Sequence, residues 1–228
     1  MPRPSTFITV KPSVFFWLLD KSGWSISEIA NKIEYDEHEM RKWREKPENI
    51  EMPLSKIEKI SKLIKRPLSA FFLPEPPKQP KMPKDFRKLP DSSQGELSVY
   101  TKETMLAFRK AVRLQDVSRE LMQNLNEFTV VDISKYSLLD DPEAIANFER
   151  KRSGLSLDLQ INLANPTDMY GVWRDWLSSQ GIFIFQFDIP LEDARGFVLI
   201  ESEPKIIVVS KKDAIKGRIF SLIHEYSH

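Results

Sequence analysis

The last residues of the chain, His224, Glu225 and His228, have the types and spacing of a zinc-binding helix, His-Glu-x-x-His. Positions i and i+4 lie on one face of a helix, so His224 and His228 present two imidazoles to one point. Neutral imidazole binds zinc at about 2.0–2.1 Å. The pattern therefore predicts a zinc site with His224 and His228 as metal ligands. The alternative is a pair of exposed or otherwise hydrogen-bonded histidines near a frayed helix end.

Glu225 directly follows the first histidine, where its carboxylate can reach a water molecule on the metal. Zinc lowers the pKa of that water towards about 7, and the carboxylate takes its proton as hydroxide attacks a carbonyl. The same carboxylate can then deliver a proton to the leaving amine. We therefore predict that Glu225 is the catalytic general base of a peptidase.

Only two zinc ligands are visible, whereas catalytic zinc sites generally have three protein ligands and one water. The chain ends at the second histidine, and terminal helix turns fray. We therefore expect the sequence to be an incomplete piece of a zinc enzyme that holds zinc weakly and lacks activity by itself.

The composition limits the classes of protein that fit. A chain of 228 residues allows one large domain or two small ones. Cysteine is absent, which excludes disulfides and thiolate ligands and fits a reducing cytoplasm, so any metal must use histidine and carboxylate. No apolar run approaches the roughly 20 residues that span a bilayer, and the first ten residues lack a secretory signal. We expect a cytoplasmic protein with no membrane partner.

The net charge of +1 conceals an asymmetry between the two ends of the chain. Residues 1–90 hold 18 Lys and Arg against 12 Asp and Glu, whereas residues 91–228 hold 16 against 21. A basic amino-terminal part can meet phosphate, and an acidic remainder is less suited to do so. Solvated surface of uneven sign is the alternative explanation.

Helix signals fill the amino-terminal part of the chain. Ser25 and Glu28 form a capping box that begins one helix, and Asp36 begins the next. Pro53 precedes a third helix with apolar residues at helical intervals. These signals predict a small all-helical domain over residues 1–74. Residues 75–95 are rich in proline and lysine and predict a semi-rigid linker.

The segment 96–228 predicts a second, α+β domain. A long helix is expected from Glu103 to Asn126. Two further helices are expected to begin after Asp141 and Asn165, each of which precedes a proline, and to end at a later glycine. Runs rich in β-branched and aromatic residues then predict a small sheet of about three strands, and a helix follows from near Asp213 to the end. The core positions that we expect in the long helix are Leu106, Val112, Leu114, Val117 and Leu121.

Several stretches of the chain resemble the ImmA/IrrE family of metallo-endopeptidases with an amino-terminal XRE-type helix-turn-helix domain. They are residues 25–30 (SISEIA), 43–45 (WRE), 65–74 (KRPLSAFFLP), 85–87 (DFR), 181–185 (GIFIF), 193–198 (DARGFV), 205–210 (KIIVVS) and 218–228 (RIFSLIHEYSH). The resemblance implies a zincin-like fold of the gluzincin kind, with a downstream glutamate as the third zinc ligand. It also implies a repressor or similar regulatory protein as substrate, and a setting in toxin–antitoxin or mobile-element loci.

In such a helix-turn-helix, residues 36–45 would form the helix that reads DNA. Its exposed donors are His38, Arg41, Lys42 and Arg44. Its first turn, however, carries Asp36, Glu37 and Glu39, and carboxylates repel phosphate. The sequence leaves DNA binding and protein binding open as alternatives. Met40 and Trp43 are typical of core positions rather than base contacts.

Three functions are consistent with these features of the sequence. The first is a zinc endopeptidase that acts on a regulatory protein, with a peptide substrate adding to an edge of the small sheet. The second is a DNA-binding transcriptional regulator or antitoxin, bound to a toxin, in which the peptidase fold is only a scaffold. The third is a plain interaction domain without metal.

Overall fold

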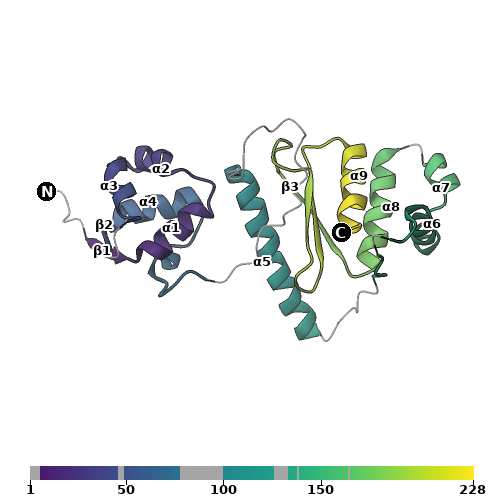
Figure 1. Cartoon of the computed structure of the whole chain (residues 1–228), viewed down its shortest axis with the longest axis horizontal. Coiled ribbons are helices and arrows are strands. Elements are labelled where there is room, and N and C mark those ends of the chain that lie inside the picture. The colour runs from purple at the N-terminus through teal and green to yellow at the C-terminus, as the bar shows by residue number, and fades with distance from the viewer. Residues whose placement is uncertain (1–5, 46–48, 78–99, 126–132, 138, 164) are drawn as a thin grey trace. The chain divides into compact units, whose positions relative to one another are not determined.

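A computed structural model describes residues 6–45, 49–77, 100–125, 133–137, 139–163 and 165–228 (Figure 1). The chain is α+β and forms two compact units, the first with the described residues up to 77 and from 100 to 106, the second from Ala107 onwards. The predicted linker over 75–95 therefore lies outside the described residues except for 75–77, as does the stretch 85–87. No described helix is long and apolar enough to cross a membrane.

The first unit consists of short helices and one two-stranded ribbon. The predicted capping box is confirmed, because the Ser25 hydroxyl accepts from the Glu28 backbone N–H and the Glu28 carboxylate accepts from the Ser25 N–H. Asp36 caps the next helix by accepting from the N–H groups of His38 and Glu39. The elements in chain order are β1 (Phe7–Val10), α1 (Pro12–Asp20), α2 (Ile26–Ile33), α3 (Glu37–Lys42), β2 (Ile50–Pro53), α4 (Leu54–Ile64) and the 3-10 helix η1 (Leu68–Phe72).

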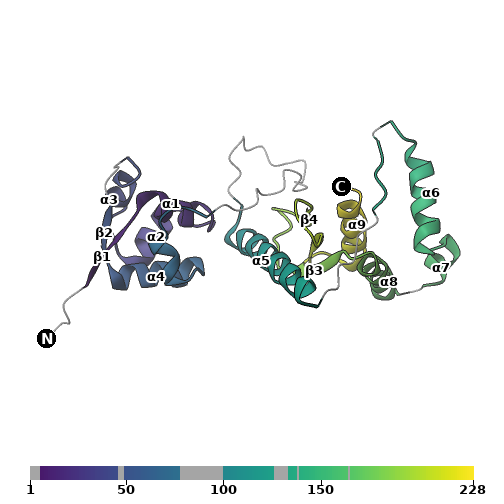
Figure 2. The ribbon, with the colours of Figure 1, turned by 90° about the horizontal axis from the view of Figure 1, so that it is seen from below.

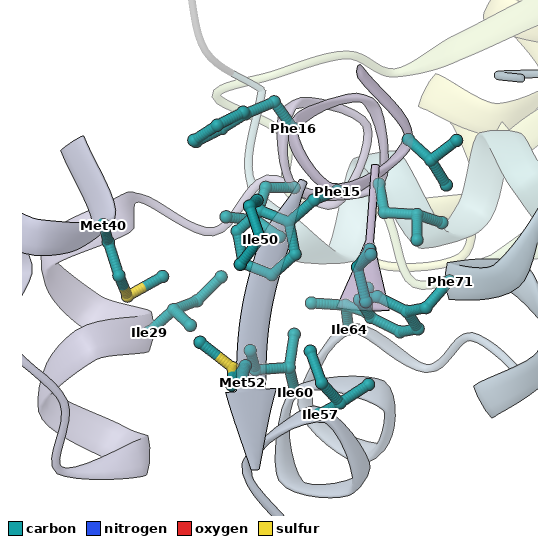
Figure 3. Close-up of a cluster of buried hydrophobic side chains, with 14 of the residues drawn as sticks. Phe15, Phe16, Ile29, Met40, Ile50, Met52, Ile57, Ile60, Ile64 and Phe71 are labelled. Atoms are coloured by element: carbon teal, nitrogen blue, oxygen red, sulfur yellow. The ribbon is translucent and has the colours of Figure 1, made fainter. Parts of the chain in front are cut away.

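One continuous apolar core holds these short elements together (Figure 3). Phe15 lies at its centre and meets Trp43 and Phe71 at ring-centroid distances of 5.8 and 6.3 Å. Met40 is fully buried, and Trp43 packs against the same core, as expected for positions that do not contact bases. Isolated helices of 6 to 11 residues are marginal in water, so this shared core supplies their stability.

The prediction of an all-helical first domain is wrong in one respect. Residues 7–10 pair antiparallel with residues 50–53, with Val10 opposite Ile50 and Phe7 opposite Pro53. Each strand has only four residues, too few for a period of two to stand out. Their pairing joins segments about forty residues apart, so no local pattern indicates it.

The second unit contains one three-stranded sheet and the remaining helices. The strands β3 (Phe183–Phe187), β4 (Gly196–Leu199) and β5 (Ile206–Ser210) agree with the three predicted runs. The order is β3-β5-β4, with β3 parallel and β4 antiparallel to β5. The helices are α5 (Lys102–Leu125), whose first five residues belong to the first unit, α6 (Pro142–Ser153), α7 (Leu157–Asn162), α8 (Pro166–Ser179) and α9 (Ile215–Tyr226).

The sheet is covered on both faces, which explains the full burial of β5. Phe108 of α5 meets Phe197 of β4 at a ring-centroid distance of 5.9 Å on one face. On the other face α8 and α9 pack against the sheet, with Leu177 and Leu222 in the core between them. Figures 1 and 2 both show α6 and α7 beyond α8 and α9, away from the sheet.

Two predictions about helices need correction. The buried face of α5 carries Phe108, Ala111 and Gln115, whereas Leu121 is 54% exposed. The Gln115 amide donates to the carbonyls of Ser202 and Pro204, so a polar residue occupies the interface. The last helix ends at Tyr226 instead of running to the end of the chain.

Candidate metal centre

Helix α9 carries the three predicted residues in its last turn and just beyond it. Its start is held by a network of charged side chains: Arg195 donates to the Asp213 carboxylate at 2.7 Å, and Arg218 donates to Gln186 on β3 at 2.8 Å. The Asp213 carboxylate is only 6% exposed. A Cβ on Gly217 would lie 2.5 Å from the Asp213 oxygens, so only glycine fits at this position.

The two histidines converge on one point, as predicted. Their Nε2 atoms lie 3.4 Å apart, and the rings stand at 88° with centroids 4.9 Å apart. Two imidazoles bound tetrahedrally at about 2.0–2.1 Å from one zinc ion would place their nitrogens about 3.3–3.4 Å apart. The separation of the two nitrogens therefore equals that of two ligands of one zinc ion, and it also allows a hydrogen bond between the rings.

The His224 ring is oriented by its neighbour one turn earlier. Phe220 stacks on it with centroids 6.1 Å apart and an interplanar angle of 13°. Phe220 is 56% exposed, His224 is half-buried and His228 is exposed. These rings occupy one accessible face of the helix, which a metal ion or a substrate can reach.

Glu225 lies on a different face of the helix and points into the protein. It is 4% exposed and packs against Gly196 at the start of β4. A Cβ on Gly196 would lie 3.3 Å from Glu225 Cγ, 3.4 Å from Oε1 and 2.8 Å from the Val208 carbonyl oxygen. The bare Cα of Gly196 thus makes room for the carboxylate beside the strand.

The remaining aromatic residue of the motif anchors it to the helical layer. Tyr226 packs edge-on against Trp176 of α8 at 5.3 Å between centroids, and its hydroxyl donates to Glu149 of α6 at 3.0 Å. Burial and the bond to Glu149 raise the pKa of Tyr226 to about 12, so its hydroxyl remains a donor at neutral pH. Sequence reasoning missed Tyr226, Gly196 and Glu149, because their roles depend on partners distant in the chain.

In the described part of the motif, the side chains that could bind a metal are the two imidazoles, whereas Glu225 lies on another face of α9. The described residues contain no group of three histidine, aspartate or glutamate side chains arranged to hold a metal ion. The pair supplies two of the three protein ligands that catalytic zinc sites generally have.

The four donors predicted to contact DNA lie on or just after α3, but three of them are engaged within the protein. Arg41 pairs with Glu37 at 2.6 Å and Lys42 with Glu39 at 3.3 Å, while Arg44 pairs with Asp20.

His38 is exposed in the acidic first turn of the same helix. Hydrogen bonds from Ser27 and then Arg41 lower the pKa of Glu37, and backbone N–H bonds lower that of Asp36. Both carboxylates therefore stay charged near neutral pH on the surface that would face DNA.

No protein-family model, curated protein or solved structure matches this chain. Any assignment of function therefore depends on the geometry of its own residues.

The close approach of Glu225 to Gly196 yields a direct test. We expect Gly196→Ala to lower the free energy of unfolding by about 1–3 kcal/mol, because the added methyl overlaps the Val208 carbonyl and displaces Glu225. Gly171→Ala is the matched control: it lies in α8 with open space around it, and we expect a gain of about 0.5–1 kcal/mol. Scanning calorimetry measures both. Equal stability of Gly196→Ala and the parent would contradict the described packing.

Proposed function

We propose that this chain carries the zinc-binding and proton-transfer residues of a zinc-dependent endopeptidase. The observation that supports it is the 3.4 Å separation of the His224 and His228 Nε2 atoms on the helix that also carries Glu225. A bound zinc ion would supply Lewis acidity to a water molecule and to a peptide carbonyl. With two protein ligands in the described part of the chain, we expect the zinc to bind weakly.

In this proposal Glu225 acts first as a general base and then as a general acid. Its carboxylate accepts a proton from the attacking water and later gives it to the leaving amine nitrogen. Packing against Gly196 fixes the side chain and shields it from bulk water, so the proton has a defined acceptor. This assignment explains why a carboxylate occupies a core position of α9, where an apolar side chain would cost less to bury.

An extended peptide fits this proposal as substrate. Among the described strands β4 lies at an edge of the sheet, antiparallel to β5, and Glu225 packs against its first residue, Gly196. Peptides commonly add to such an edge through backbone hydrogen bonds. A peptide on β4 would pass close to Glu225. We propose a regulatory protein, such as a repressor, as the source of the peptide.

We infer further that the first unit recognises a protein partner, and the observation that favours this is the engagement of its basic residues. Arg41, Lys42 and Arg44 each face a carboxylate of the same unit. A donor already paired with a carboxylate must break that pair to contact phosphate, and Asp36 and Glu37 add repulsion at the same end of α3. A toxin or another regulator is the class of partner that we propose.

Zinc binding tests the metal site directly. We expect isothermal titration to show one weak zinc site, and we expect His224→Ala or His228→Ala to weaken it by more than the roughly 10- to 100-fold typical of outer-shell changes. The matched control is His38→Ala, which removes the remaining histidine of the chain and should leave the affinity unchanged. Affinity should also fall as the pH falls, because protons compete for the imidazole nitrogens. Zinc binding that survives loss of both motif histidines would contradict the proposal.

The proton-transfer role is tested by Glu225→Gln, which keeps the shape of the side chain and removes its basicity. We expect zinc affinity to persist and cleavage of a peptide library, read by mass spectrometry, to fall by about 10²–10⁴-fold. The comparison is made between parent and variant chains of equal length. Glu192→Gln is the control at an exposed glutamate. Cleavage at the parent rate by Glu225→Gln would refute Glu225 as the base.

The partner of the first unit is tested by charge reversal. We expect the double variant Arg41→Glu, Lys42→Glu to leave retention on immobilised random-sequence duplex DNA at low salt unchanged, since both side chains are already paired. The matched control reverses the exposed Lys59 and Lys62 on α4. Strong retention of the parent that only the Arg41 and Lys42 reversal abolishes would establish a DNA-binding surface instead.

A further inference from the structure

The second histidine of the motif, His228, lies two residues beyond the last residue of α9. Helix α9 ends at Tyr226, Ser227 is its C-cap, and His228 lies beyond the helix with its side chain exposed. The 3.4 Å approach of the two Nε2 atoms therefore depends on the position of this last turn.

Tyr226 lies in that turn, and its side chain contacts α6 and α8. Its ring packs on Trp176, and its hydroxyl donates to Glu149 Oε2 at 3.0 Å. Arg152 Nη1 also donates to the Tyr226 hydroxyl, at 3.4 Å. The last turn is thus attached to α8 through a ring contact and to α6 through hydrogen bonds.

Glu149 and Arg152 are themselves fixed, so the hydroxyl meets a rigid partner. Their side chains are only 15% and 19% exposed and pair at 3.4 Å one turn apart on α6. Arg152 Nη2 donates to Gln180, the C-cap of α8, at 2.7 Å, and the Tyr136 hydroxyl donates to the other carboxylate oxygen of Glu149 at 2.7 Å. Charged hydrogen bonds of limited exposure are stronger than neutral, solvated ones.

We propose that Tyr226 is a positioning residue for the metal centre: through its hydroxyl bond to Glu149 it holds the last turn of α9 so that His228 stays opposite His224. The residue touches neither substrate nor metal and acts on the second ligand through two residues of backbone. This inference rests on the proposed zinc site, and it adds α6 to the elements that determine metal affinity. Without the hydroxyl, the ring contact with Trp176 remains but the turn loses its link to α6.

The test compares two substitutions that each remove one hydroxyl from the same carboxylate. Tyr226→Phe removes the donor to Glu149 Oε2, and Tyr136→Phe removes the donor to Oε1 without touching α9. We expect Tyr226→Phe to weaken zinc affinity by about ten-fold, the lower end of typical outer-shell effects, and Tyr136→Phe to leave it unchanged. Competition with a chromophoric chelator measures the affinity in the 228-residue chain.

A second measurement, without metal, separates this inference from the zinc proposal. Amide hydrogen exchange at Ser227, whose N–H donates to the carbonyls of Ile223 and His224, should accelerate in Tyr226→Phe and not in Tyr136→Phe, because only the first frees the turn. If the parent binds no zinc but the exchange result holds, the zinc site fails and the anchoring role stands. If the parent binds zinc and both variants bind it equally well, or if exchange is unchanged in Tyr226→Phe, the positioning role is overturned. Equal losses of zinc affinity in both variants would show general destabilisation of α6 and also overturn it.

Discussion

The close packing of α9 on the sheet, made possible by the bare Cα of Gly196, is the contact on which the candidate metal centre depends. It brings the Glu225 carboxylate to the first residue of β4 and leaves the histidine face of the same helix accessible. A helix that stood further from the strand would expose Glu225 and rotate or lift the imidazoles. One small residue on β4 thereby leaves α9 with a buried face that carries Glu225 and an accessible face that carries the two histidines.

The two ends of α9 are held by different sets of hydrogen bonds, and each set includes an ion pair. At the start, the Arg195–Asp213 pair and the bond from Arg218 to Gln186 link the helix to the sheet. At the end, Tyr226 links it to the Glu149–Arg152 pair of α6. Apolar contacts such as those of Leu222 fix the distance between helix and sheet but tolerate small rotations. Directional bonds at both ends restrict such rotation, as the proposed binding of one ion by both histidines would require.

Local sequence signals predicted where helices and strands lie better than they predicted which elements pair with one another. The caps at Ser25 and Asp141 and the β-branched runs of the sheet depend on neighbouring residues, and the structure agrees with them. The β1–β2 ribbon depends on pairing across about forty residues, and nothing near Phe7 indicates it. On α5, leucines and valines occur on more than one face, so composition favoured the wrong one. Gln115 lies in the buried interface because it bonds to carbonyls of another segment.

The same distinction explains which parts of the metal centre were visible in the sequence. The relation of His224 to His228 is a property of one helix, so spacing alone predicts it. The supports of that relation lie on β4, α6 and α8, and each pairs with α9 only in the folded chain. A buried glutamate such as Glu225 is an expensive way to fill a core, because an apolar residue of similar size packs there at lower cost. Three polar features hold α9 in place: Glu225 beside β4, Arg195–Asp213 at the start of the helix and Glu149–Arg152 at its end. Stability alone does not call for a carboxylate at the position of Glu225, whereas its proposed role as a base would.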